Sequence, residues 1–207
     1  SGSMFFAAYI SGGTSQIGIG RASVAWDLNA TATGAGAIQV NAWNHFVAVR
    51  SGTTLSVYVN GVRAGTATNS TNYGLSGGSA QIWAQTTTVS GAGYMSSMRV
   101  VKGTAVYDPT QSTLTVPTAP LTAISGTSLL LNFTNGGIVD ATSKNDLETV
   151  GNAQISTTQS KFGGSSMYFD GTGDYLIAPY SQLSDFGTGD FTVEFWMNAS
   201  AAGSYVI

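Results

Sequence analysis

The most constraining feature of the sequence is an alternation of apolar and polar residues with a period of two, broken at short intervals by glycine and serine. The stretch Thr53–Thr66 shows it best, because aliphatic residues alternate with polar ones as far as Asn60-Gly61 and resume beyond it. Asn-Gly supplies the positive φ values of a two-residue hairpin turn, so we predict a β-hairpin here. No stretch keeps a helical period. The pattern predicts an all-β fold, an antiparallel jelly-roll β-sandwich.

Further strands are expected wherever residues rich in aromatic and β-branched types lie between glycine and serine clusters. These expected strands are Phe5–Ile10, Ser23–Ala30, Trp43–Arg50, Ala80–Gln85, Gly93–Lys102, Ser128–Phe133, Ser165–Asp170, Tyr175–Ala178, Phe191–Met197 and Tyr205–Ile207. The segment Asp108–Gly126 differs, because it carries three of the four prolines among threonine and serine. Proline offers no backbone donor, so this segment is interpreted as a linker or as an extended edge that crosses the surface.

Charge and cysteine content exclude several classes of partner. Charged residues make up 8% of the 207 residues, the net charge is −3, and there is no basic run. Nucleic acids and anionic membrane surfaces need clustered Lys and Arg, so neither is expected as a partner. No apolar run approaches the roughly 20 residues that span a bilayer, and no membrane insertion is expected. The absence of cysteine excludes disulfides and thiolate zinc sites.

Four segments resemble the laminin-G-like domains of the concanavalin A-like lectin/glucanase superfamily, of the kind found in phage tail and virion proteins. They are Ala42–Thr66, Met98–Leu121, Ser128–Pro179 and Gly187–Asn198. In that family the segments similar to the last two come first, whereas here they come second. The resemblance therefore implies permuted halves, through either a window cut from tandem repeats or a circular permutation.

The permuted order leads to an expectation about domain organisation. Residues 1–107 would supply the C-terminal half of one repeat, residues 108–127 a proline-rich linker, and residues 128–207 the N-terminal half of the next. We expect the two halves to close into a single sandwich domain, 1–207, in which Val206–Ile207 leads towards Phe5. Strand exchange between molecules, giving a dimer or fibre, is the alternative.

The residues that acid–base catalysis would need are scarce. His45 is the only histidine and lies within an expected strand, where we interpret it as a packed structural residue. Glycosidases of this fold carry paired carboxylates, but Glu194 is the only acidic residue of its strand. The chain is therefore predicted not to be an enzyme. Glu194 is either an acceptor for a sugar hydroxyl or a partly buried carboxylate paired with arginine or with the backbone.

Calcium is the one candidate cofactor. Asp170 and Asp174 flank a glycine-rich turn, and Asp140 is a third candidate ligand, since carboxylate oxygens suit calcium. Ordinary turn chemistry accounts for the same residues. Related folds carry an acid where this chain has Ser96 and Ser97, which departs from the pattern of the family's structural calcium site.

Aromatic side chains are the candidates for sugar binding. We expect Trp43 to be a core residue. Trp196 and Glu194 should lie on the strand face opposite Phe191, Val193 and Phe195. The candidate ligand-binding residues are Trp26, Asp27, Trp83, Tyr94, Glu194 and Trp196.

The resemblance and the aromatic residues together predict a function. The first hypothesis is a non-catalytic carbohydrate-binding or adhesion module of a phage tail or virion surface protein, located at the virion or extracellular surface. Its partner would be a cell-surface glycan or polysaccharide. The alternatives are a structural spacer or decoration domain that contacts other virion subunits, and a polysaccharide hydrolase.

Overall fold

The structure is a computed structural model that describes residues 4–21, 25–74, 80–83, 91–134, 137–178, 185–201 and 204–206. Apart from one 3-10 turn, η1 (Gly34–Gly36), the regular elements of these ranges are strands, so the all-β prediction is confirmed. The strands are β1 (Met4–Ser11), β2 (Thr14–Arg21), β3 (Ala25–Ala32), β4 (Trp43–Ser51), β5 (Thr54–Val59), β6 (Val62–Thr68), β7 (Ala80–Ile82), β8 (Gly93–Lys102), β9 (Thr127–Leu131), β10 (Glu148–Val150), β11 (Gln154–Ser156), β12 (Ser166–Phe169), β13 (Tyr175–Ala178), β14 (Phe191–Ala199) and β15 (Ser204–Val206).

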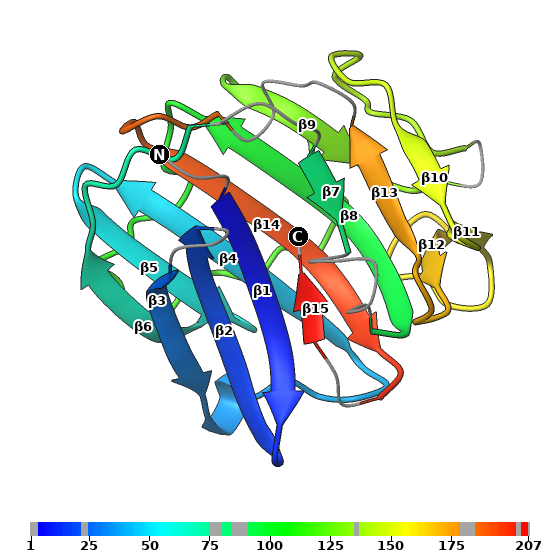
Figure 1. Cartoon of the computed structure of the whole chain (residues 1–207), viewed down its shortest axis with the longest axis horizontal. Helices are drawn as coiled ribbons and strands as arrows, with labels where there is room; N and C mark the ends of the chain where they lie inside the picture. The colour runs from blue at the N-terminus through cyan, green and yellow to red at the C-terminus, as the bar shows by residue number, and fades with distance from the viewer. Residues whose placement is uncertain are drawn as a thin grey trace.

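The strands form two stacked layers (Figure 1). One layer is an eight-stranded sheet in the order β11-β12-β8-β14-β4-β5-β6, with β9 paired to β8. The other layer consists of a four-stranded sheet, β15-β1-β2-β3, and a three-stranded sheet, β10-β13-β7. Within the described residues, none of the helices is long and apolar enough to cross a membrane.

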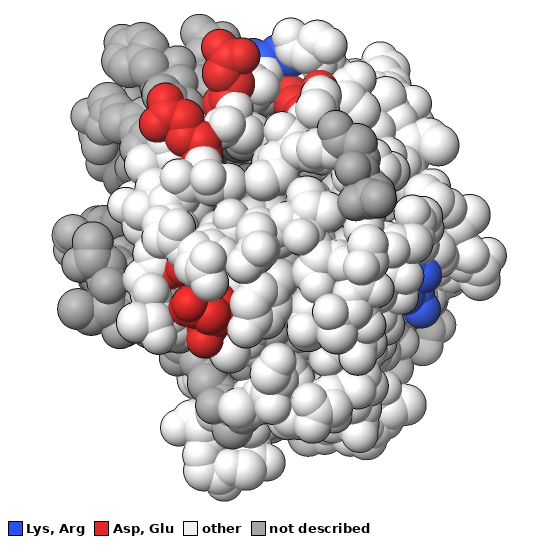
Figure 2. All heavy atoms as spheres, turned by 90° about the vertical axis from the view of Figure 1, so that its right-hand side faces the viewer, with Lys and Arg blue, Asp and Glu red and all other residues white. Residues whose placement is uncertain are grey.

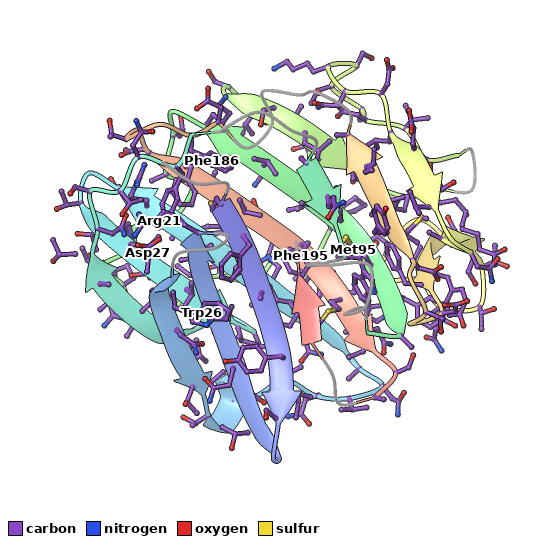
Figure 3. All side chains as sticks on the ribbon, viewed as in Figure 1. Arg21, Trp26, Asp27, Met95, Phe186 and Phe195 are labelled. Atoms are coloured by element: carbon purple, nitrogen blue, oxygen red, sulfur yellow. The ribbon has the colours of Figure 1, made fainter. Side chains whose placement is uncertain are left out.

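One apolar core fills the space between the layers. Along β14 every second side chain points into it, as the period of two requires. Phe195 stacks on Phe46 of β4 with ring centroids 5.2 Å apart, and it meets Phe6 of β1 edge-on at 5.6 Å. Figure 3 labels Phe195 and Met95 among these core residues. The inward side chains of β14 are Phe191, Val193, Phe195, Met197 and Ala199.

Strands from the two ends of the sequence are neighbours throughout the structure. β14 lies between β4 and β8 and pairs with both. β15 pairs with β1, with Val206 opposite Ala7. The last described strand of the chain therefore lies beside the first one.

The predicted hairpin is confirmed, whereas three strands were missed. Val59 pairs with Val62, and Asn60 and Gly61 between them have φ values of 51° and 78°. β2, β10 and β11 were not predicted, because β2 has few branched residues and the other two are only three residues long. Parts of three expected strands, at residues 23–24, 84–85 and 207, lie outside the described residues.

Residues 103–126, which we call the strap, cross the outer face of the eight-stranded sheet. Of the two interpretations from the sequence, linker or extended surface crossing, the second describes its path. A small second apolar cluster lies beneath it, separate from the main core. In this cluster the sheet contributes Val47, Val49 and Tyr58, and the strap contributes Ala105, Tyr107 and Leu114.

Side chains of the sheet hold the strap by its main-chain carbonyl groups. Ser56 Oγ donates a hydrogen bond to the Pro109 carbonyl at 2.7 Å. Tyr58 Oη donates to the Gln111 carbonyl at 2.8 Å. The strap also donates to the hairpin turn, through the Leu114 N–H. The strap is thus a fixed part of the outer face.

Candidate functional site

An aromatic platform lies on the solvent side of the four-stranded sheet. Register places Phe5 opposite Gly20 and Gly20 opposite Trp26. The Trp26 ring packs edge-on against Phe5, with centroids 4.7 Å apart, and lies 6.1 Å from Tyr9. These three rings, which we call the platform, face away from the core because Phe6, Ala8, Ile17 and Ile19 occupy the inward positions.

The absence of a side chain at Gly18 allows Trp26 to lie over the sheet. A Cβ atom at Gly18 would come within 2.6 Å of the indole ring, so only glycine permits this contact. Trp26 keeps 39% of its surface exposed, and Figure 3 shows it on the open side of β2 and β3. Asn29 Nδ2 donates to Tyr9 Oη at 2.9 Å, which places an amide and a hydroxyl beside the rings.

Asp27 does not serve as the acceptor beside Trp26 that the sequence led us to expect. A bulge in β3 turns its side chain away, and that side chain is only 8% exposed. Its carboxylate accepts two hydrogen bonds from Arg21, each 3.1 Å long, and a third from Tyr73 Oη at 3.2 Å. Burial and the neighbouring charge of Asp27 raise the pKa of Tyr73. Asp27 is a structural ion-pair partner.

The remaining candidates divide between the core and the other layer. Tyr94, Glu194 and Trp196 all lie on the outer face of the eight-stranded sheet, and the expected position of Glu194 and Trp196 opposite the core is confirmed. Trp83 does not reach a surface, since it is fully buried and stacked on Phe169 at 4.4 Å. The ligand-binding prediction for Trp83 is therefore wrong for this conformation, because no ring face is open.

Glu194 lies at the centre of a buried polar cluster beneath the strap. Arg99 donates to its Oε1 atom from Nε at 2.9 Å and from Nη2 at 2.5 Å. Tyr107 of the strap donates to Oε2 at 2.6 Å, and His45 Nε2 lies 3.5 Å from the same oxygen. Because 3.5 Å is long for a hydrogen bond, we assign the principal contacts to Arg99 and Tyr107. Glu194 and His45 are both fully buried.

The surroundings of Glu194 hold it in the ionised form. Burial by itself would raise its pKa, but the contact with His45, the charge of Arg99 and the hydrogen bond from Tyr107 together lower it. The same carboxylate, with burial, raises the pKa of Tyr107. An ionised, enclosed carboxylate has no proton to give and no access to a substrate. The interpretation of Glu194 as a sugar acceptor is thus wrong for this conformation, and the paired interpretation describes it.

The candidate calcium ligands do not fit a cation. Asp140 accepts backbone N–H groups of Leu130, Thr142 and Asn145, and these bonds lower its pKa against the opposing effect of burial. Asp174 accepts the N–H groups of residues 152 and 170 at 2.6 Å each. N–H donors compete with a cation for the same oxygen lone pairs. The described residues contain no group of three or more His, Cys, Asp or Glu that could hold a metal ion.

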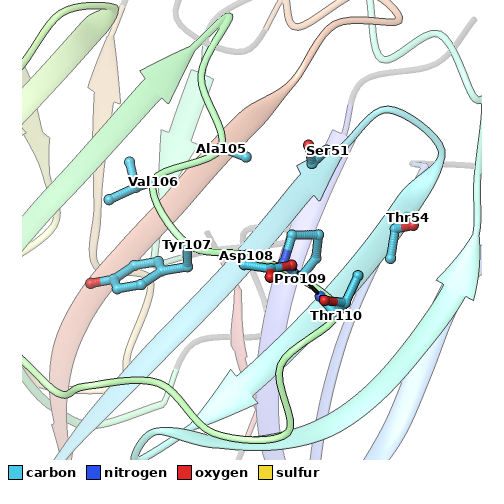
Figure 4. A pocket seen from close by; sticks show the side chains of 8 residues that line it. All are labelled: Ser51, Thr54, Ala105, Val106, Tyr107, Asp108, Pro109 and Thr110. Atoms are coloured by element: carbon cyan, nitrogen blue, oxygen red, sulfur yellow. Dashed lines mark hydrogen bonds between the residues drawn. The ribbon is translucent and has the colours of Figure 1, made fainter.

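A shallow open pocket of about 300 Å³ lies between the strap and the adjoining ends of β4 and β5 (Figure 4). It is lined by Ser51, Thr54 and strap residues 105–110. Asp108 at its edge is already engaged by Thr110 and Gln111, whose hydrogen bonds lower its pKa. None of the sequence-predicted residues lines it. The platform is therefore the better candidate site.

The fold and the open aromatic platform define a β-sandwich binding module. The chain belongs to the concanavalin A-like lectin/glucanase superfamily, because a laminin-G-type family model with that description matches residues 1–106, just over half of the chain. Comparisons with curated proteins and with solved structures found no match. Domains of this superfamily often bind glycans or proteins, and the lectin-type fold is generally non-catalytic.

Sequence reasoning found Trp26 but missed the residues that make it a platform. Phe5 and Tyr9 became its neighbours only through the pairing of β1 with β2, a strand that was not predicted. The available signal was the alternation of Phe5, Ala7 and Tyr9, which placed these residues on one strand face.

Proposed function

We propose that this protein is a non-catalytic carbohydrate-binding module that binds a neutral sugar ring on the platform. The observation that carries the proposal is Trp26, an indole that lies over Gly18 with 39% of its surface exposed. Stacking on an aromatic face recognises the apolar C–H face of a pyranose. Tyr9 and Asn29 stand beside the rings as partners for its hydroxyl groups.

The charge distribution around the platform supports a neutral ligand. Arg21 and Asp27 are the nearest oppositely charged side chains, and they neutralise one another. A bound charged group would find no unpaired counter-charge there. We therefore expect binding to be insensitive to salt, because screening acts only on uncompensated charge.

Replacement of Trp26 tests the proposal. Neutral oligosaccharides are screened on a glycan array, and the best ligand is titrated by calorimetry against the wild type and Trp26→Ala. Loss of the stacking surface should weaken binding at least about tenfold, which corresponds to about 1.4 kcal/mol. Val139→Ala, a change at an exposed apolar side chain outside the platform, is the matched control and should bind like the wild type. Equal binding by Trp26→Ala, or no neutral ligand at millimolar concentration, would reject the proposal.

We also propose that the module acts at a virion or extracellular surface, as part of a phage tail or other virion protein with permuted halves. Two facts support the permutation. The family match ends one residue before the expected boundary at residue 107, and β14 from the second half pairs with β4 and β8 from the first. Analytical ultracentrifugation tests the closed form: a monomer is expected, and obligate dimers would indicate strand exchange.

A further inference from the structure

A row of polar and aromatic side chains crosses the outer face of the eight-stranded sheet, at the end that the strap does not reach. Register brings its members together one strand at a time, from β4 through β14, β8 and β12 to β11. All five lie at outward positions, because the inward positions of their strands are taken by core residues, such as Phe46 on β4 and Met197 on β14. The row, which we call the strip, is Trp43, Asn198, Tyr94, Tyr168 and Gln154.

The strip has the dimensions and chemistry of an oligosaccharide site. Neighbouring strands lie about 4.8 Å apart, so five strands span about 19 Å, the length of a short oligosaccharide. The rings of Tyr94 and Tyr168 lie 5.1 Å apart at the centre, and both side chains are partly exposed. Trp43, expected in the core, is half-buried at one end.

Buried polar groups in the row beside the strip lack partners among the described residues. In the adjoining row, Trp196 Nε1 and Ser96 Oγ are buried and unpaired among the described residues. Register places Trp196 directly opposite Ser96, so these two groups lie side by side. Buried polar groups without partners are costly, and a ligand or bound water would relieve that cost.

The side chain of Lys161 places a positive charge over the same end of the sheet. Lys161 Nζ lies 3.9 Å from the centroid of the Trp196 ring, and Phe162 packs edge-on against that ring. Among the described residues Lys161 has no ion-pair partner, and burial lowers its pKa. Figure 2, which views the molecule from the side of β11 and β12, shows acidic side chains gathered towards the other layer. Lys161 is thus a positive charge without an ion-pair partner among the described residues, and it lies over Trp196, two residues before Asn198 on β14.

We infer that the strip is a second glycan site, which takes an extended chain carrying a carboxylate, such as a uronate oligomer. Tyr94 and Tyr168 stack on its sugar rings, Asn198 and Gln154 bond its hydroxyls, and Lys161 pairs with the carboxylate. The inference rests on the proposed carbohydrate-binding function but concerns a different face and a different class of glycan. The two sites differ in their response to salt, because only the strip uses a charge pair.

The test uses uronate oligomers with and without their charge. Oligomers of galacturonate, of alginate and of hyaluronan are titrated by calorimetry, each beside its methyl-esterified, neutral counterpart. At least one acidic oligomer should bind, with affinity falling as salt rises and about tenfold weaker after esterification. Binding of none of the acidic oligomers, or equal binding of both forms, would overturn the inference.

Three variants separate the strip from the platform. Lys161→Gln should remove the salt dependence and weaken binding of the acidic oligomer about tenfold. Tyr168→Ala should weaken acidic and esterified forms alike, provided that thermal unfolding shows an intact fold. Trp26→Ala should leave this binding unchanged. Wild-type affinity in both Lys161→Gln and Tyr168→Ala contradicts the inference, whereas loss of neutral-sugar binding alone contradicts only the platform.

Discussion

Replacing Glu194 with glutamine should destabilise the protein more than any surface change, because the pair that it forms is buried. The glutamine keeps the shape of the side chain but removes its charge. Arg99, only 6% exposed, then loses its counter-ion, and its two bonds to Oε1 lose their ionic component. Breaking a buried pair by removing one partner costs about 3–5 kcal/mol, and the retained amide oxygen places this variant near about 3 kcal/mol.

Urea unfolding followed by circular dichroism measures the change in free energy of unfolding. In a chain of this size, about 3 kcal/mol corresponds to a fall in Tm of about 6–12 °C. The matched control is Glu148→Gln, which changes the only other glutamate. Glu148 is exposed on β10, and this change should stay within about 0.5 kcal/mol of the wild type.

A double variant distinguishes lost pairing from general damage to the sheet. Arg99→Met with Glu194→Leu removes both charges at similar volume, so it leaves no unpaired ion beneath the strap. It should therefore be more stable than Glu194→Gln, since apolar replacement of a buried pair is often neutral. The reasoning is wrong if Glu194→Gln unfolds like the wild type, or if the double variant is the less stable of the two.

Two further predictions concern acid and the strap. The pKa of Glu194 is lower in the folded than in the unfolded protein. Its contribution to the free energy of unfolding is therefore complete above about pH 4.3, the ordinary glutamate value, and is lost as the pH falls through the folded pKa. Urea titrations between pH 6 and pH 3 should show a steeper loss of stability for the wild type than for Glu194→Gln; parallel curves would contradict this assignment. Gly61→Ala should cost more than Gly52→Ala, because a Cβ at Gly61 would lie 2.6 Å from the Leu114 carbonyl oxygen, whereas a Cβ at Gly52 has nothing within 4 Å. Both positions have positive φ, so Gly52→Ala, the control, should lower the free energy of unfolding by about 1–2 kcal/mol. An equal loss in Gly61→Ala would show that the strap moves aside at no energetic cost.

The elements that could be predicted from the sequence are those specified locally. The hairpin at Asn60-Gly61 depends on backbone preferences of two adjacent residues, and the faces of β14 follow from alternation alone. The strip could not be predicted, because its members come from five strands and meet only through long-range register. Trp83 was misplaced for a related reason: the three-residue strand before it carries no period from which burial could be read.

The same limit applied to Glu194. The sequence indicated its face, but the partners that enclose it come from β8 and from the strap. A proline-bearing segment without regular alternation gives no sign that its one tyrosine, Tyr107, will lie over a carboxylate. Asp27 was misread because a single extra residue in β3 reversed the direction of its side chain.

The way in which the sheet holds the strap has a consequence for engineering. Ser56, Tyr58 and Arg63 donate hydrogen bonds to main-chain carbonyl oxygens of the strap. Every amino acid has such an oxygen. The side chains at residues 110–113 are exposed, and those of Thr110 and Gln111 bond Asp108 within the strap, so this anchoring to the sheet does not use them. This short stretch can therefore display foreign peptide sequences on a rigid backing.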